Sequence, residues 1–370
     1  MAQFEINPGA HALVVGASGV AGWAVVDQIL EHYPNHGTFS TVTALVNRPL
    51  AVADSGWPEL SHSRPRLDLV SGIDLTTGTA DEFTYKFDQN PETESEINRG
   101  MLERLLVALE NLAVDLAMVV LASGAMSYGI YTSGGVFKAP FKESMVLTGP
   151  ITKSIFHFAL KDVLREKCKG KGWTWCEIRP DAIIGFVPNG NAFNLTAHWA
   201  NYLSLYALVE GKGATVPFPG SIEGYQALSN EASADSIAKI SIWASLHPDK
   251  SGNGELFNIA DQNQPSNMSQ RWPQLAQYFG LKGTGPIDDP NALRPSAYIK
   301  KHQDVLEKYG VKNSNVAQAE RLDGYGYHYT FDRQLSLDKA REAGFSDEID
   351  PASSWYKAFD RFKRFGMIPT

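Results

Sequence analysis

Apolar and polar positions alternate in a regular way over the first half of the chain. Residues 11–15 form a short apolar run that ends in the glycine-rich sequence GASGVAG. The next stretch repeats apolar residues three and four positions apart, which is the period of a helix with one buried face: Val25, Val26, Ile29 and Leu30. This pattern predicts a strand, a tight turn and a helix, in that order.

Four further apolar runs predict strands of the same kind. They lie at residues 41–46, 67–71, 116–122 and 173–178. Helical patterns at residues 98–111 and 148–167 precede the last two of these runs. Strands that alternate with helices are typical of a parallel sheet covered by helices on both faces. We therefore predict an α/β fold built on a Rossmann-type, doubly wound parallel sheet.

The pattern changes beyond residue 184, where loops lengthen and aromatic residues cluster. Residues 267–280 have the periodicity of an amphipathic helix, and proline, glycine and polar residues dominate residues 283–295. We predict a sheet domain over residues 1–190. A smaller C-terminal α/β region over residues 191–370 is expected to bind the substrate and to return in part to the sheet.

Composition excludes several classes of protein. Hydrophobic residues make up 43% of the 370 positions and charged residues 20%, which is the balance of a globular protein with a large core. The net charge of -8 and the lack of a basic stripe argue against a nucleic-acid partner. No apolar run reaches the roughly 18 residues of a membrane span. Two cysteines without zinc-like spacing predict a reducing, cytoplasmic location and no metal site.

The glycine spacing predicts a dinucleotide-binding loop. Gly16, Gly19 and Gly22 follow a strand and open a helix. In such loops the first glycine permits the turn, the second lets the pyrophosphate approach, and the third lets helix and strand pack closely. Ser18 and Val20 lie in the same loop, where amide groups at the start of the helix attract phosphate. The alternative is a glycine-rich turn that binds nothing.

The end of the second predicted strand favours NADP(H) over NAD(H). NAD binding requires an acidic residue there to hold the ribose hydroxyls. This chain has Asn47 and Arg48 instead, and Arg48 can meet the 2′-phosphate of NADP, unless it is only a solvated loop residue. Asp74 and Leu75 follow the third strand and are placed to meet the adenine edge. A helix-capping role for Asp74 is the alternative.

Several short motifs occur together along nearly the whole chain. They are GASGVAG at residues 16–22, NRP at 47–49, DL at 74–75, IRPDAIIGF at 178–186, WPQLA at 272–276, FG at 279–280 and SLDKAREAGF at 336–345. The set resembles the extended short-chain dehydrogenase/reductases, and more narrowly the progesterone 5β-reductase and iridoid synthase-like enzymes. The resemblance implies NADPH-dependent reduction of an activated C=C bond. It also implies nicotinamide contacts from Ala122, Ser123, Pro180 and Ile183.

Two positions depart from that family. The family's lysine, in a Thr-Gly-x-Lys pattern, corresponds to Met126, and its tyrosine, in an Asn-Phe-Tyr-Tyr-x-x-Glu-Asp segment, corresponds to Phe158. No Tyr-x-x-x-Lys pair elsewhere restores them. Hydride addition to an enone builds negative charge on the carbonyl oxygen, which a hydroxyl donor and a cation stabilise. Methionine and phenylalanine supply neither, so the sequence predicts changed chemistry.

Three residues near these positions are candidate replacement donors. Tyr128 and Tyr131 lie in the loop after Met126, and His157 lies beside Phe158. Each has an alternative role, since either tyrosine can simply close the pocket and the histidine can be a buried structural residue. Ser123 can bond to substrate or nicotinamide, or cap its strand. Lys153 and Lys161 are interpreted as parts of a solvated helix face.

The substrate is predicted to be a small hydrophobic molecule such as an isoprenoid, a polyketide or an alkaloid. The predicted pocket consists of Met126, Phe158, Asn194, Trp199, Tyr202 and Tyr206. A plain aromatic core is the competing interpretation of the last four residues.

The sequence therefore leaves three functions open. The favoured one is a redox-neutral cyclase, pericyclase or isomerase that orients a flexible substrate and keeps NADP as a structural or electrostatic group. The second is an NADPH-dependent enone or enal reductase, with Tyr128, Tyr131, His157 or water as the proton source. The third is a non-catalytic NADP-binding protein. The oligomeric state, a homodimer included, stays open.

Overall fold

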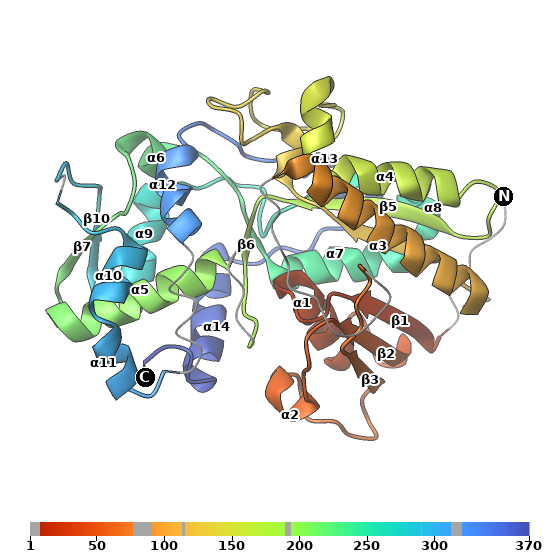
Figure 1. The fold of residues 1–370 in the computed structure, drawn as a ribbon, viewed down its shortest axis with the longest axis horizontal. Coiled ribbons are helices and arrows are strands. Elements are labelled where there is room, and N and C mark those ends of the chain that lie inside the picture. Colours follow the sequence, from red (N-terminus) through yellow and green to blue (C-terminus); the bar gives the residue numbers. More distant parts are fainter. Residues whose placement is uncertain are drawn as a thin grey trace.

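The computed structural model describes residues 8–76, 90–112, 115–188, 194–289, 291–311 and 320–369. Parallel strands flanked by helices form the part that contains the N-terminus (Figure 1). A mainly helical part, built from the second half of the chain, lies beside it. The α/β class and the Rossmann-type fold predicted from the apolar pattern are both confirmed.

The first sheet contains the predicted strand, turn and helix. Strands β1 (Ala10–Val15), β2 (Phe39–Val46) and β3 (Arg66–Ser71) are parallel, with β2 in the centre. The glycine loop joins β1 to helix α1 (Val20–Leu30), and the short helix α2 (Val52–Ser55) follows β2. This arrangement brings the carboxyl ends of all three strands to the edge where the glycine loop lies.

The second sheet is also parallel and has β5 in its centre. It contains β4 (Met118–Ala122), β5 (Thr174–Pro180) and β9 (Glu255–Ile259). Helices α3 (Pro91–Leu112) and α4 (Phe156–Lys167) cover one face, where Leu106 and Leu164 share a core cluster with Trp175. Helix α7 (Ala234–Leu246) covers the other face, where its residues pack on Ile178.

The two sheets are adjacent but are not joined by backbone pairing. The strand pairs of the described residues link β1 only to β2, and β4 only to β5. Helices α1 and α7 pack on each other between the sheets, and Ala21 of α1 belongs to the cluster around Ile178. The doubly wound architecture is therefore held across its middle by helix packing.

Helices around an aromatic core dominate the C-terminal part. The ring centroid of Trp199 lies 5.4 Å from that of Trp272 and 5.5 Å from that of Trp355. The longer helices are α5 (Leu195–Glu210), α9 (Met268–Tyr278) and α14 (Pro351–Arg364). The shorter helices are α6 (Ile222–Gln226), α8 (Pro248–Ser251), α10 (Pro295–Lys301), α11 (Gln303–Lys308), α12 (Tyr325–His328) and α13 (Asp338–Ala343).

Residues 231–259 come back to the sheets from the second half of the chain. They comprise β8 (Glu231–Ser233), α7 and β9, and β8 pairs with β6 (Ala182–Ile184). A further small sheet joins β7 (Thr215–Pro217) to β10 (Lys282–Thr284). The domain boundary placed at residue 190 stays a prediction.

The long helix predicted over residues 148–167 is wrong at its start. Gly149 adopts a φ of +87°, and Pro150 opens a single 3-10 turn, η2 (Pro150–Ser154). Ile155 is extended, with φ -121° and ψ 99°, so α4 begins only at Phe156. Helix α3 shows the opposite error, because it begins at Pro91, seven residues before the predicted start, with proline in the first position that tolerates it. Within the described ranges, no helix is long and apolar enough to cross a membrane.

Candidate functional site

The glycine loop has the geometry of a phosphate cradle. Gly16 has a φ of +75°, which favours glycine, and its carbonyl oxygen accepts a hydrogen bond from the Gly19 amide at 2.8 Å. A Cβ on Gly22 would lie 2.4 Å from that same oxygen, so only glycine fits there. A Cβ on Gly19 would approach only the Gly16 oxygen, at 3.2 Å. The first turn of α1 has no side-chain cap, so its amides are available to a ligand.

The residues predicted to meet the adenosine half lie at the ends of β2 and β3. The Ile73 amide donates to the Val46 carbonyl at 3.3 Å, which brings these two ends together. Arg48 is exposed, and its guanidinium has no ion pair or hydrogen bond with the described residues. Its backbone amide donates to the Asn47 side chain at 2.9 Å. The position leaves Arg48 available for a 2′-phosphate.

Asp74 is buried and already engaged. Its carboxylate accepts hydrogen bonds from the amide and the hydroxyl of Thr76, at 2.7 and 2.6 Å. Arg104 of α3 donates to the Leu75 carbonyl at 2.6 Å. Asp74 thus stabilises a local turn, and its predicted contact with adenine stays a prediction.

The predicted nicotinamide residues converge with His157 at the ends of β4 and β5. A Cβ on Gly124 would lie 3.7 Å from the Pro180 carbonyl oxygen and 3.8 Å from the His157 ring. The Ser123 amide donates to the Ile178 carbonyl at 2.9 Å, which fixes this loop on β5. Ala122, exposed at the end of β4, precedes it. One of the three candidate donors therefore lies beside the segment expected to contact the nicotinamide.

The segment after β5 that is predicted to contact the nicotinamide also reaches the glycine loop. Ile183 lies in β6, which ends at Ile184. A Cβ on Gly185, the next residue, would lie 2.5 Å from the Val20 side chain. The structure thus connects the predicted cofactor residues of α1 with those that follow β5.

A buried layer of charged side chains lies directly below this convergence. We call Lys161, Glu177 and Arg179 the charged layer. The Glu177 carboxylate accepts from Lys161 Nζ at 3.2 Å, from the Arg179 guanidinium at 2.8 and 3.1 Å, and from the Ser123 hydroxyl at 2.5 Å. The three side chains are 7%, 3% and 4% exposed. Burial acts to raise the pKa of Glu177, but Arg179 and Lys161 outweigh it and hold that pKa below its usual value.

The interpretation of Lys161 as a solvated residue is wrong. Its ammonium is buried between α4 and β5, where burial lowers its pKa and Glu177 opposes that effect. The signal that was missed is in β5, where Glu177 and Arg179 stand two positions apart in an otherwise apolar strand. Alternate residues share one face of a strand, and buried charges require partners. The lysine one turn along the same face of α4 as His157 is that partner.

His157 is neutral at physiological pH. Its ring is 5% exposed, and burial lowers its pKa to about 4, with Arg179 and Lys161 adding to the shift and Glu177 opposing it. Ser127 Oγ lies 3.4 Å from Nδ1. A neutral imidazole has one N–H donor and one acceptor nitrogen. A hydrogen bond at Nδ1 therefore determines whether Nε2 donates or accepts.

The two candidate tyrosines are placed differently. Tyr128 is fully buried, its hydroxyl donates to the Asn258 side chain at 2.8 Å, and burial raises its pKa to about 12. The Arg179 guanidinium lies 4.3 Å from its ring centroid. Tyr131 is 64% exposed and faces Tyr329 at a ring distance of 6.4 Å. The hydroxyl of Tyr128 is therefore committed to Asn258, while that of Tyr131 lies near Tyr329, where burial raises its pKa.

Met126 and Phe158 lie at the rim of the same region. Both side chains are partly buried. The Lys161 ammonium lies 4.2 Å from the centroid of the Phe158 ring, which is a cation–π contact. Position 126 thus carries no cation, but the buried charged layer contains the Lys161 ammonium.

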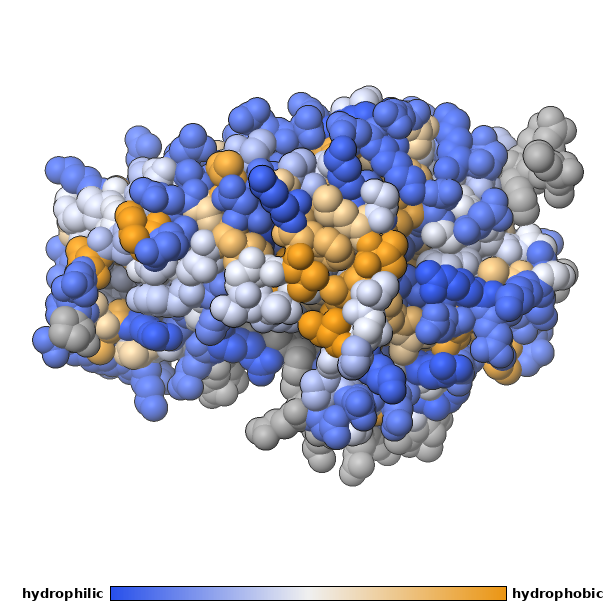
Figure 2. All heavy atoms as spheres, turned by 90° about the horizontal axis from the view of Figure 1, so that it is seen from above, coloured by the Kyte–Doolittle hydropathy of each residue, from blue (hydrophilic) through white to orange (hydrophobic). Residues whose placement is uncertain are grey.

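The surface above this region is apolar. Residues 129–149 (yellow, at the top of Figure 1) expose Tyr131, Val136 and Val146. Figure 2 looks onto this side of the molecule and shows an apolar area near its centre. Phe141 anchors the segment, because its amide and carbonyl pair with Gln334 and Ser336 at 2.8 and 2.9 Å. An apolar approach to the predicted nicotinamide residues suits a hydrophobic substrate.

The remaining predicted pocket residues lie in the core around α5. Trp199 and Tyr202 are 1% and 4% exposed, and Trp199 stacks on Trp355 at 5.5 Å. Asn194 caps α5 by accepting from the Ala197 amide. Tyr206 donates to the Thr215 carbonyl at 3.0 Å. Residues 195–205 of α5 are buried on all sides, polar His198 and Asn201 included, so the helix is enclosed by its neighbours, which is the competing interpretation of this cluster.

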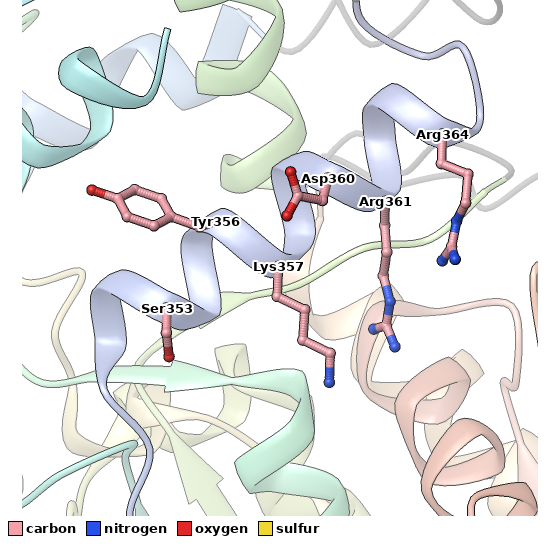
Figure 3. Close-up of a pocket in the computed structure, with 6 residues that line it drawn as sticks. All are labelled: Ser353, Tyr356, Lys357, Asp360, Arg361 and Arg364. Atoms are coloured by element: carbon pink, nitrogen blue, oxygen red, sulfur yellow. The ribbon is translucent and has the colours of Figure 1, made fainter.

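A separate cavity of about 480 Å³ lies on the exposed side of α14. Figure 3 shows Lys357, Arg361 and Arg364 pointing to the same side of this helix. Lys357 is paired with Asp235 and Arg361 with Asp27. The cavity contains none of the residues predicted from the sequence, and its cations are largely neutralised.

Comparison with known proteins places the chain in a family. The family model of the PRISE-like Rossmann-fold domain matches residues 12–84 and 79–369. The chain belongs to this family. The resemblance to progesterone 5β-reductase and iridoid synthase-like enzymes is thereby confirmed, and so is the extended short-chain dehydrogenase/reductase fold.

Two relatives and one solved structure illustrate the range of this PRISE-like family and its fold. A short chain dehydrogenase, ausT, of Aspergillus calidoustus is 31% identical, covering 97% of this chain and 94% of the relative. A 3-oxo-Δ(4,5)-steroid 5β-reductase of Arabidopsis thaliana is 26% identical, covering 97% and 93%. The structure of a UDP-glucuronic acid 4-epimerase from Bacillus cereus, in complex with NAD, has a TM-score of 0.58 at 14% identity, covering 96% of this chain and all of that one. This last likeness shows the fold alone.

Proposed function

We propose that this PRISE-like protein is an NADPH-dependent reductase of a C=C bond conjugated to a carbonyl group in a hydrophobic small molecule. An isoprenoid, a polyketide or an alkaloid fits the apolar surface over residues 129–149. The observation that carries the proposal is the convergence of His157 with Gly124 and Pro180 at the ends of β4 and β5. The free thiols of Cys168 and Cys176 support a cytoplasmic location as part of the proposal.

The cofactor residues of the proposal follow from the cradle and its neighbours. The amides of the glycine loop and of the first turn of α1 hold the pyrophosphate, and Arg48 holds the 2′-phosphate. NADPH, when bound, supplies a hydride. Ser123 donates its hydroxyl proton to Glu177, so it presents only lone pairs to the site and accepts a bond from a nicotinamide amide or a substrate hydroxyl.

His157 polarises the substrate in this proposal. Ser127 Oγ lies 3.4 Å from Nδ1, and the tautomer required by this proposal accepts there from Ser127 and carries its proton on Nε2, towards the substrate oxygen. A neutral imidazole is an effective donor to a carbonyl oxygen that gains negative charge. Hydride adds to the β-carbon, the C=C electron pair moves to give an enolate on the bound oxygen, and the α-carbon takes a proton from water. The product gains two hydrogens.

The cofactor preference gives a first prediction. Replacing Arg48 by alanine is expected to weaken NADP(H) binding about tenfold or more and to leave NAD(H) binding unchanged, because only NADP carries the 2′-phosphate. Calorimetric titration of both nucleotides measures this. The Arg66→Ala variant is a control, because this exposed cation at the start of β3 is paired with Asp68. Equal loss for both nucleotides contradicts the assignment.

The reaction is tested by following NADPH absorbance against a panel of cyclic and open-chain enones. We expect NADPH consumption matched by a product two hydrogens heavier. Deuterated NADPH is expected to place one deuterium at the β-carbon. The absence of any NADPH consumption, with substrate converted to an isomer of equal mass, contradicts the reductase proposal.

A redox-neutral cyclase or isomerase is the second candidate, and one observation favours it. Met126 and Phe158 remove both proton-bearing groups from the positions where the family resemblance places the catalytic pair. Orientation of a flexible substrate lowers a barrier without a proton donor. Conversion to an isomer at an unchanged NADPH concentration supports this candidate. Nucleotide binding without conversion of any substrate supports the third one, a non-catalytic NADP-binding protein.

A further inference from the structure

We propose that Lys161 supplies, through the charged layer, the positive charge that Met126 no longer provides to the active site. This inference rests on the proposed function, because it assigns Lys161 as a positioning residue for His157. Lys161 reaches the site through Glu177 and Arg179 and does not itself touch the predicted nicotinamide residues.

The side chains of the charged layer and His157 lie on α4 and β5. His157 and Lys161 stand four residues apart on one face of α4. Glu177 and Arg179 stand two residues apart on one face of β5, and their side chains meet Lys161 and Ser123. The layer therefore lies between α4 and β5, on the side of the sheet that carries His157.

The charges of the three residues in the charged layer do not cancel. The carboxylate of Glu177 neutralises one of the two cations, so the three residues together carry one net positive charge. Burying a cation without a matching anion is costly, and here all three side chains are at most 7% exposed. A fold that needed only a stable ion pair would keep one cation with Glu177. Glu143 lies near Arg179 and offsets part of this charge, and the buried cations at the ends of β4 and β5 indicate a role towards an anion.

The charged layer changes the electrostatic environment around His157. A positive charge in a poorly hydrated environment favours negative charge that develops nearby, such as that of an enolate oxygen held by His157. Burial is the main cause of the low pKa of His157, and Arg179 and Lys161 lower that pKa further. Glu177 opposes this effect, and Glu143 faces Arg179 from the loop after β4. The cations of the charged layer thus favour negative charge on the substrate oxygen and lower the pKa of His157.

Lys161→Met tests the inference in the full-length protein. Glu177 keeps its bonds to Arg179 and Ser123 in this variant, so the carboxylate does not lose all its partners. We expect the pKa of His157, followed by NMR of labelled histidine without nucleotide, to rise by about one unit. We expect kcat to fall about tenfold, with little change in KM, because the developing enolate loses a nearby cation while the substrate-binding residues are unchanged.

Three further variants separate charge from packing. Arg165→Met removes an exposed cation from the same helix, paired only with Asp162, and is expected to change neither value. Lys161→Arg keeps the charge and is expected to retain the low pKa of His157. Lys161→Met combined with Glu177→Gln restores one net positive charge through Arg179 and is expected to return that pKa towards the wild-type value.

The histidine titration separates failure of this inference from failure of the proposed function. An unchanged His157 pKa in folded Lys161→Met overturns the inference, whatever substrate the enzyme uses. An equal shift in Arg165→Met overturns it as well. If no enone consumes NADPH, the reductase proposal fails, while a raised His157 pKa in Lys161→Met and its return in the double variant still support the electrostatic coupling.

Discussion

Replacement of Asp181 by alanine is expected to lower the free energy of unfolding by about 3–5 kcal/mol, because it leaves a buried cation without its partner. Asp181 accepts from Arg333 Nε at 2.9 Å, and the two side chains are 5% and 3% exposed. The guanidinium also donates to the Tyr325 hydroxyl at 2.8 Å. Burial raises the pKa of Asp181, and Arg333 opposes that shift more strongly than the Ala182 backbone amide does.

Urea unfolding of wild type and variant measures this loss. Lys357→Met is the matched control, because the Lys357–Asp235 pair is on the surface, with the lysine side chain 51% exposed. We expect that control to change stability by less than about 1 kcal/mol. Asp181→Asn combined with Arg333→Met removes both charges and is expected to recover part of the loss. A cost below about 1 kcal/mol for Asp181→Ala means that water reaches Arg333.

Replacement of His157 by phenylalanine is expected to lower kcat by about 10²–10³-fold, the usual cost of losing one donor to a developing oxyanion. Cofactor affinity is expected to stay unchanged, since the glycine loop and Arg48 are untouched. The wild-type rate is expected to be constant near neutral pH and to fall only as pH drops through about 4, where the imidazole becomes charged and its tautomer is lost.

Tyr131→Phe serves as the control for this experiment. In the proposed function His157 is the donor and Tyr131 faces Tyr329, so we expect Tyr131→Phe to retain most of the rate. A large loss in Tyr131→Phe together with an unchanged rate in His157→Phe would assign the donor role to the tyrosine. Unchanged rates in both would leave water as the donor.

The local parts of the fold were predictable from sequence because their causes are local. The apolar run at residues 11–15, followed by glycines at fixed spacing, specifies strand, turn and helix with no reference to distant residues. Gly22 was recognisable for the same reason, since its Cβ would collide with a residue six positions away. The start of α4 was missed although Gly149 and Pro150, which open the separate turn η2 before it, interrupt the helical pattern.

The parts that depend on distant partners were not predictable in this way. Lys161 has the sequence context of a surface helix, and only its contact with Glu177, on the following strand, shows that it is buried. Trp199 and Tyr202 are aromatic in either a pocket or a core, and the choice is made by Trp272 and Trp355 far along the chain. His157 was a candidate from its position, but Ser127 and Pro180 give it a defined environment.

The return of residues 231–259 to the sheets has a consequence for how the chain acquires its structure during synthesis. The face of β5 that carries Cys176 and Ile178 shares a core cluster with Ile237 of α7 and Phe257 of β9, and also with Ala340 and Phe345 from the C-terminal part. Until the ribosome has released residue 259, that face stays open, and a nascent chain ending near residue 190 presents apolar surface that invites chaperone binding or aggregation. Residues 1–190 and 191–370 are therefore expected to fold as one cooperative unit. Its slowest contacts are expected between β5 and β9, which are about 80 residues apart in sequence.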